Sequence, residues 1–308
     1  MASTLVADIG GTNIRFAIID KGKLGSFRLY PHEHALTAEH AIKQYLLETR
    51  LKPNSLIVGA AGVLLPNGKI QLTNRRFMID MPKLCRKFGF QTGLLTNDMV
   101  LHALGVADLP DTNNACVVYV GTGMGCAYIK GGIVYPSEDG HLTIPKVDSA
   151  AQAVGATVWE DMISGPAFLK IYRSLSGPQK PVVQSREVSY LAHHGRDENA
   201  IETYRIIARY LSRFCQQIAT QKKVSVFYLG GKIMEVLRTT DAQDIFFNNL
   251  GKLADIVSFR QIRPEMHSAM TGLKLLEKDL RKTGTTNRVS SSDFYIYHAK
   301  KTKNNIVD

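Results

Sequence analysis

The chain builds one glycine-rich unit twice, about a hundred residues apart. The first copy, VADIGGTNIRFAIIDKGK, begins at Val6, and the second, VVYVGTGMGCAYIKGG, begins at Val117. Each copy runs from an apolar strand through a glycine cluster into a second strand and another glycine turn. Glycines let the backbone approach a ligand closely, so that several N–H groups can converge on a phosphate. The repetition therefore predicts two α/β domains, each with a phosphate-binding hairpin.

Two better-known phosphate motifs do not fit these glycines. The pattern GxxxxGK[ST] does not occur in the sequence, which excludes a P-loop. A dinucleotide fingerprint must open a helix, whereas GTGMG is followed by the strand-like CAYIKGGIVY. Two ordinary hairpins with glycine bulges are the structural alternative. The matching positions of the two copies favour phosphate binding, with Thr12 and Asn13 placed to donate to phosphate oxygens and Asp8 to hold Mg²⁺ through water.

Hydrophobic spacing predicts the order of the other elements. Thr37 and Asp80 are placed to cap two helices, and Pro82 suits the first turn of the second. Apolar residues recur at steps of three and four from Met266 to Leu280, which is typical of an amphipathic helix. The predicted strands cover 5–9, 14–20, 24–29, 55–61 and 227–229, with others near 94–95 and from 115 onward. The predicted helices cover 38–49, 81–88, 99–104, 165–175, 198–221 and 266–280, with another from 233.

The net charge of +11 raises the question of nucleic-acid binding. Residues 281–308 hold six Lys or Arg against two Asp, which accounts for +4 of that total. The remaining charge is spread out without a long basic run or interleaved aromatics, so a solvated basic surface is favoured over a nucleic-acid partner. Residues 283–293 read as a disordered linker, and the strand-like 294–297 has no assigned place.

Cysteine usage and the N-terminal sequence indicate a cytoplasmic protein. The four cysteines have no CxxC pair or regular spacing, so neither a disulfide framework nor a zinc site is expected. The first residues lack the basic region of a signal peptide. No apolar run approaches the roughly 18 residues that span a bilayer, so we expect no membrane partner.

Taken together, the motifs resemble the bacterial-type glucokinases, a hexokinase-fold family of the actin-like ATPase (ribonuclease H-like) superfamily. DIGGTN and VGTGMG are similar to that family's two phosphate loops, and LGG at 229–231 to its adenosine loop. LTNDMVLHALG resembles its Asn-Asp segment, SEDGH its Glu-Gly-Gly-His sugar motif, and WEDMISGP the segment of a sugar-binding Glu. The matches follow in order from about residue 5 to residue 277. The resemblance implies an α/β, two-domain actin-like ATPase fold with an interdomain cleft.

The resemblance also assigns roles to residues. Asp98 would be the catalytic base that takes the proton from the sugar 6-hydroxyl. Sugar hydroxyls would be bound by Asn97, Glu138, His141 and Glu160, and carboxylates with an Asn do suit a vicinal polyol. Mg²⁺ would be held by Asp8 through water. ATP would contact the loop residues Asp8, Ile9, Gly10, Gly11, Thr12, Asn13, Gly121, Thr122, Gly123, Gly125, Gly230 and Gly231.

The implied architecture has a small α/β domain at 1–107 that is completed by the helix 266–282. A larger α/β domain covers 108–265, and 283–308 form a basic, disordered tail. The implied function is ATP-dependent phosphorylation of glucose at its 6-hydroxyl, in an enzyme compatible with a homodimer. Phosphoryl transfer depends mostly on positioning and charge stabilisation, so two phosphate loops, a metal and one carboxylate suffice.

Structural interpretations of single residues stay open beside this assignment. Asp98 could simply cap the helix that follows it, and a Glu such as Glu160 is common before a helix because of the helix dipole. His141 alone would more often be an ordinary loop histidine. The run His32-Glu33-His34 resembles a set of metal ligands, but it lies in a polar connection, which argues against a metal site.

Departures from the family pattern concern activity more than fold. Asp139 stands where the family has a glycine, which adds a third acid to the sugar motif and could strain its backbone. The segment 142–159 is short, and the basic tail after Arg281 has no counterpart in the family. These differences leave open a kinase for another hexose, or a catalytically weak sugar- or nucleotide-sensing protein of the same fold.

Overall fold

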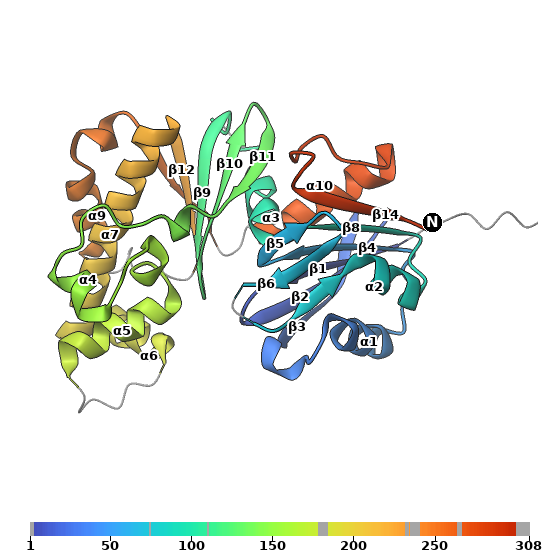
Figure 1. The fold of residues 1–308 in the computed structure, drawn as a ribbon, viewed down its shortest axis with the longest axis horizontal. Helices are drawn as coiled ribbons and strands as arrows, with labels where there is room; N and C mark the ends of the chain where they lie inside the picture. Colours follow the sequence, from blue (N-terminus) through green and yellow to red (C-terminus); the bar gives the residue numbers. More distant parts are fainter. Residues whose placement is uncertain are drawn as a thin grey trace, which may run out of the picture. The chain divides into compact units, whose positions relative to one another are not determined.

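The computed structural model describes residues 3–73, 75–109, 111–177, 184–231, 234, 241–263 and 267–299. The chain divides into two compact units, which are considered separately below. Unit 1 comprises Met1–Gly105 and Ala269–Asp308, and unit 2 comprises Val106–Ser268. Both are mixed α/β (Figure 1). The helix predicted from residue 233 lies outside the described residues, as does Met266.

Unit 1 is built on a mixed sheet with the strand order β14-β8-β4-β1-β2-β3. β1 to β3 form the predicted antiparallel meander, whereas β1, β4 and β8 run parallel. Lys21 and Gly22 have φ of +49° and +75°, the backbone that a tight hairpin turn with the right-handed twist of strands requires. The bounds are β1 Thr4–Ile9, β2 Asn13–Asp20, β3 Lys23–Pro31, β4 Ser55–Ala60, β8 Thr92–Asn97 and β14 Phe294–His298.

Helices cover both faces of this sheet (Figure 1). α1 (Ala38–Thr49) and α2 (Met81–Phe88) lie on one face, and α3 (Asp98–Leu104) and α10 (Ser268–Thr283) on the other. The predicted caps are confirmed, because the Thr37 and Asp80 side chains accept from the N–H groups of His40 and Lys83. The sequence did not predict the small sheet of β5 (Gly62–Leu65), β6 (Lys69–Leu72) and β7 (Met78–Asp80).

The C-terminal segment completes unit 1 instead of forming a disordered linker over 283–293. β14 pairs antiparallel with β8, so that Tyr295 lies opposite Leu95. Before it, Val289 is buried, and the Thr286 hydroxyl donates to Asp279 of α10 over 2.8 Å. The strand-like pattern at 294–297 therefore has a place, as the edge strand beside β8. The polar composition had suggested disorder because the partner of this segment, β8, is distant in the sequence: the Asp293 carbonyl accepts from the Thr96 hydroxyl, 197 residues away.

Unit 2 repeats the arrangement of unit 1 with a different sequence. Its sheet has the order β11-β10-β9-β12-β13, with β9 to β11 antiparallel and β9 parallel to β12. Gly131 and Gly132, at φ +56° and +80°, form the turn that corresponds to Lys21 and Gly22. The predicted repetition is thus confirmed. The bounds are β9 Asn114–Val120, β10 Met124–Lys130, β11 Ile133–Ser137, β12 Val226–Gly230 and β13 Ser258–Gln261.

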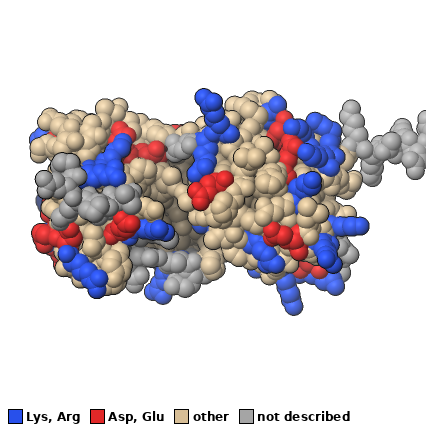
Figure 2. Space-filling model, turned by 90° about the horizontal axis from the view of Figure 1, so that it is seen from below, with Lys and Arg blue, Asp and Glu red and all other residues tan. Residues whose placement is uncertain are grey.

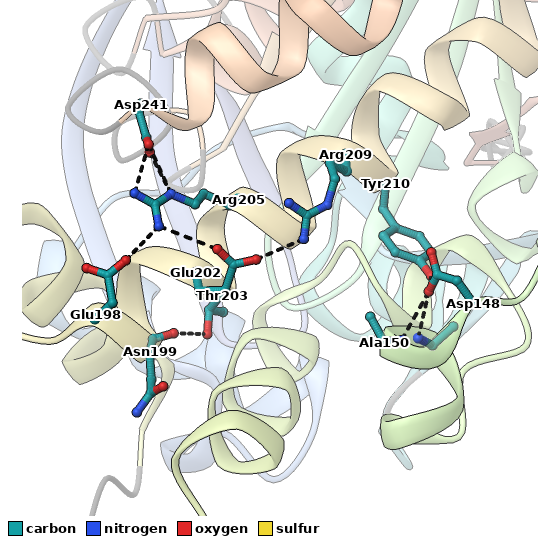
Figure 3. Close-up of polar contacts among 11 residues, drawn as sticks. Asp148, Ala150, Glu198, Asn199, Glu202, Thr203, Arg205, Arg209, Tyr210 and Asp241 are labelled. Carbon is teal, nitrogen blue, oxygen red and sulfur yellow. Dashed lines mark hydrogen bonds and ion pairs between the residues drawn. The ribbon is translucent and has the colours of Figure 1, made fainter.

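The long helix α7 (Glu198–Lys222) supplies much of the core of unit 2. Its aromatic residues Tyr210 and Phe214 pack edge-on against Trp159. Its polar face carries ion pairs from Arg205 and Arg209, at 2.6–2.9 Å to Glu198, Asp241 and Glu202 (Figure 3). The other helices are α4 Ser149–Val154, α5 Gly165–Ser176, α6 Ser185–His193 and α9 Ala242–Leu250, of which only α5 was predicted.

The basic surplus is not gathered into one patch on the face shown in Figure 2, where Lys and Arg alternate with Asp and Glu. That distribution agrees with a solvated basic surface. Within the described ranges, the helices are too short or too polar to cross a bilayer.

Candidate active site

The first glycine loop, residues 10–13, and the Asn-Asp segment lie at the same edge of the unit 1 sheet. In the parallel strands β1, β4 and β8, Ile9 is in register with Ala60, and Ala60 with Asn97. Parallel strands end at one edge, and neighbours are spaced about 4.8 Å apart, so the loop 10–13 and Asn97 are roughly 10 Å apart. The sheet thereby brings together two segments that are separated by more than eighty residues.

Asp8 and Ile9 are the last two residues of β1, directly before the loop. Asp8 is buried, with 2% of its surface exposed, and its Oδ2 accepts from Nη1 of Arg15 over 2.7 Å. A buried carboxylate requires such a partner, since an unpaired charge is costly there. The side chain of Ile9 is in the core, so any contact of Ile9 with a phosphate would use its backbone.

Asn97, and not Asp98, caps helix α3. The Asn97 Oδ1 accepts from the N–H of Met99 over 2.8 Å, and its Nδ2 donates to the carbonyl of Gly62 over 2.9 Å. Asp98 is the first helical residue and is half-buried. The N-cap of α3 is therefore Asn97 and not Asp98. A carboxylate at the first helical position is also stabilised by the helix dipole.

The second glycine loop in unit 2 joins β9 to β10 in a tight turn. The N–H of Gly121 donates to the carbonyl of Gly123 over 2.8 Å, and the Gly121 carbonyl accepts from the N–H of Gly165 over 2.7 Å. A Cβ on Gly121 would meet nothing within 4 Å, so the space beside it is open. Thr122 is the exposed tip of the turn, and Gly125 lies in β10.

Gly230 and Gly231 lie next to this loop at the end of β12. Gly230 is in register with Tyr119, just before the loop. Gly231 has φ of +98°, and a Cβ built there would lie 1.9 Å from the Val120 carbonyl oxygen. Only glycine fits this close approach and this backbone conformation. The two glycine clusters thus form one feature of unit 2.

The predicted sugar residues of unit 2 form a compact cluster. His141 Nδ1 lies 3.1 Å from Glu138 Oε2, and His141 Nε2 lies 3.6 Å from Glu160 Oε1. The second carboxylate oxygen of Glu160 accepts from the N–H of Met124 over 2.8 Å, which ties the cluster to the glycine loop. The side chains of Glu138 and His141 are 56% and 42% exposed, so a ligand can reach them.

The short segment 142–159 explains why His141 and Glu160 meet. Its two ends pair, with the Trp159 N–H donating to Leu142 and the Ile144 N–H donating to Thr157. This pairing places the residues that flank the segment side by side. Asp148 caps α4 inside the segment and accepts from the Tyr210 hydroxyl of α7, which fixes the loop on the long helix (Figure 3).

Asp139 is turned away from the cluster of acids. It is 8% exposed, and its carboxylate accepts from the Tyr128 hydroxyl of β10. Burial raises the pKa of Tyr128 well above its ordinary value, so this hydroxyl keeps its proton and remains a donor. Asp139 lies in a 3-10 turn and has no positive φ, so the strain expected from replacing a glycine does not occur.

The sequence analysis did not identify the two side chains that bond to carbonyl groups of the first loop. His32 is 2% exposed, and its Nδ1 lies 2.8 Å from the Gly10 carbonyl oxygen. The Arg75 Nε donates to the Gly11 carbonyl over 2.6 Å. Burial lowers the pKa of His32, which keeps the ring neutral. The run of three residues beginning at His32 is not a metal cluster, and the described parts of the chain hold no group of three or more His, Cys, Asp or Glu that could bind a metal.

Comparisons with known proteins identify the family of the chain. A glucokinase family model matches residues 5–258. The glucokinase of Sinorhizobium medicae is 27% identical over 91% of this chain and 93% of its own length, and that of Rhizobium meliloti has the same values.

Solved structures share the fold at lower identity. The ROK family glucokinase of Streptomyces griseus, in complex with glucose and AMPPNP, has a TM-score of 0.69 at 19% identity and covers 89% of this chain and 99% of its own. The glucokinase of Balamuthia mandrillaris, in complex with glucose, has a TM-score of 0.72 at 16% identity, with coverage of 89% and 93%. The fold is therefore that of the actin-like ATPases, and the chain belongs to the glucokinase family of ATP-using glucose phosphotransferases.

Proposed function

We propose that the chain transfers the γ-phosphoryl group of ATP to the 6-hydroxyl of glucose, with Asp98 as the general base. The observation that carries this proposal is the position of Asp98. It begins helix α3 at the sheet edge that also bears the first phosphate loop, and its neighbour Asn97 already caps the helix. The carboxylate of Asp98 is thus placed at the sheet edge where the phosphates are proposed to bind, and the N-cap of the helix is its neighbour.

Sugar recognition is proposed for Asn97, Glu138, His141 and Glu160. The close contacts among the last three support this assignment, because they hold two carboxylates and an imidazole in one accessible cluster. Such groups accept or donate to adjacent hydroxyls, and they reject an analogue that leaves them unpaired. The contact of Glu160 with Met124 links the proposed sugar cluster to the second loop, where ATP phosphates are proposed to bind.

ATP is proposed to contact the two glycine loops and the pair Gly230-Gly231, and Mg²⁺ to be held by Asp8 through water. The residues fit such an ion, since Asp8 provides a buried carboxylate two residues before the loop glycines and Arg15 contacts its Oδ2. Mg²⁺ in phosphate sites typically uses one or two carboxylates, phosphate oxygens and several waters. When bound, the ion would neutralise charge on the phosphates.

In the proposed reaction, the oxygen of the sugar 6-hydroxyl forms a bond to the γ-phosphorus, and Asp98 accepts the proton of that hydroxyl. The bond from that phosphorus to the bridging β–γ oxygen breaks, and ADP leaves with that oxygen. The proton on Asp98 then passes to solvent. Backbone N–H groups of the loops and the sugar cluster contribute positioning, which supplies most of the catalysis in phosphoryl transfer.

The test measures ADP production with ATP over a panel of hexoses, in the wild-type chain and in Asp98→Asn. We expect glucose to be phosphorylated, and kcat to fall about 10²- to 10⁴-fold in the variant, with little change in the KM for ATP. Asp80→Asn is a matched control, because Asn caps a helix as well as Asp does. Sugar-dependent turnover that survives Asp98→Asn would refute the role of the base.

The same assay addresses the alternatives. If the enzyme prefers another hexose, that sugar and not glucose is its substrate. If no hexose is phosphorylated, the result favours a sensing protein. Asp139 no longer motivates the sensing alternative, because it is bonded to Tyr128 and does not crowd the sugar cluster. A homodimer and a cytoplasmic location remain predictions from the sequence and the family.

A further inference from the structure

Three consecutive carbonyl groups of the first phosphate loop are each held by a group of unit 1. Nδ1 of His32 bonds to the Gly10 carbonyl over 2.8 Å, and the backbone N–H of His32 donates to the Thr12 carbonyl over 2.8 Å. Between them, the Arg75 Nε donates to the Gly11 carbonyl over 2.6 Å. Three consecutive peptide groups are therefore anchored by two residues from distant parts of the sequence.

Anchoring these carbonyls also sets the direction of the amide hydrogens. In a planar trans peptide, the C=O of one residue and the N–H of the next point in opposite directions. Holding the carbonyls of Gly10, Gly11 and Thr12 therefore turns the N–H groups of Gly11, Thr12 and Asn13 away from the anchors. Thr12 is exposed and Gly11 is half-buried, so a ligand can reach this part of the loop.

We propose that His32 and Arg75 are positioning residues for ATP, which preorganise the first phosphate loop by anchoring its carbonyl groups. The proposal rests on the proposed function, since it deepens the role of the same loop. Preorganised donors bind a phosphate without the cost of ordering the loop on binding. Loss of an anchor would thus weaken nucleotide binding without touching the sugar cluster, which belongs to unit 2.

The environment of His32 supports a dedicated role for its imidazole. The ring packs edge-on against Phe77 at 4.4 Å, and its Nε2 is buried without a hydrogen-bond partner in the described part of the chain. An unpaired buried nitrogen is unfavourable, so an apolar side chain of similar size would suit this pocket better if packing were the only requirement. What the imidazole adds is the donor to Gly10. Because the acceptor is a carbonyl, Nδ1 must carry the proton in the neutral ring.

Arg75 contributes charge as well as a hydrogen bond. It is exposed, and its Nε donates to the Gly11 carbonyl, so its positive charge lies close to the loop, on the side of the anchored carbonyls. A positive charge there favours an anion, although solvent and salt screen it. Arg76, the next residue, is also exposed and provides a comparison of equal charge.

The experiment measures the affinity of a non-hydrolysable ATP analogue with Mg²⁺, without sugar, by calorimetry. His32→Leu removes the donor but keeps an apolar side chain, whereas His32→Asn keeps an amide N–H at the position of Nδ1. We expect His32→Leu to weaken binding about 5- to 10-fold, the value of one hydrogen bond, and His32→Asn to stay within about twofold of wild type. Arg75→Gln should weaken binding by a similar factor, and Arg76→Gln much less.

Two further measurements separate positioning from a general structural role. The KM for glucose and the unfolding midpoint should change far less than analogue affinity in His32→Leu. Unchanged affinity in His32→Leu and Arg75→Gln, or equal losses in affinity, glucose KM and stability, would overturn the proposal. A wild-type chain that binds no nucleotide would refute the proposed function and this inference together, whereas normal wild-type binding with unaffected variants refutes the inference alone.

Discussion

Replacing Gly231 by alanine should damage the second glycine loop, residues 121–125, through the backbone alone. The new Cβ would lie 1.9 Å from the Val120 carbonyl oxygen, far inside the 3.0 Å that real Cβ atoms keep. It would also force a residue with a side chain to hold φ of +98°. Val120 ends β9 and immediately precedes Gly121, so relief of the overlap must move the loop.

Two effects add to the expected cost. Holding a residue other than glycine at such a φ costs about 1–3 kcal/mol, and an overlap with backbone that cannot repack adds about 1–3 kcal/mol. Gly251→Ala is a matched control in the same unit, because Gly251 has φ of +53° but a Cβ there would meet nothing within 4 Å. The control should therefore lose only the backbone cost of about 1–3 kcal/mol, without the cost of the overlap.

Chemical denaturation of both variants, together with affinity for the ATP analogue, measures these effects. We expect the free energy of unfolding to fall by about 2–6 kcal/mol in Gly231→Ala, the sum of these two terms, and nucleotide binding to weaken. Gly251→Ala should bind nucleotide normally. Equal stability losses in the two variants, with unchanged binding in both, would refute the close approach of Gly231 to Val120 as the reason for the glycine.

Three other predictions follow from single contacts. Glu160→Ala leaves the Met124 N–H without its acceptor and should lower the free energy of unfolding by about 1–3 kcal/mol. Glu160→Gln keeps an acceptor and should lose glucose affinity with little loss of stability. Chemical denaturation and the KM for glucose check both expectations. Truncation after Thr283 removes β14, which pairs with β8, and should lower the unfolding midpoint. Removal of residues 300–308 alone leaves β14 in place and should not change the midpoint. Thermal denaturation of the two truncated chains measures the difference. Burial raises the pKa of Glu277, which is 4% exposed, so its stability penalty is present above that raised pKa and disappears as the pH falls below the ordinary value of 4.5. Glu277→Gln should therefore be more stable than wild type at pH 7, and denaturation as a function of pH should show the difference shrinking toward pH 4.

The sequence by itself determined the repeated hairpins and the family. Glycine and the residue before it decide local backbone conformation, so the turns at Lys21-Gly22 and Gly131-Gly132 could be located without a partner segment. The caps Thr37 and Asp80 are equally local, because a capping side chain bonds to a backbone group three residues away. The order of the motifs along the chain was sufficient to identify the family, because that order can be read without knowing any tertiary contact.

Contacts between distant segments were decided only by the tertiary structure. Nothing in the local sequence distinguishes Asn97 from Asp98 as the cap, and Asn97 also bonds to Gly62, 35 residues earlier. Asp139 looked like a third acid of the sugar motif until β10 supplied Tyr128 as its partner. His32 and Arg75 meet the first loop from 22 and 64 residues away. A side chain's hydrogen-bonding partner is set by which elements pack together, and periodicity within one element carries no information about that packing.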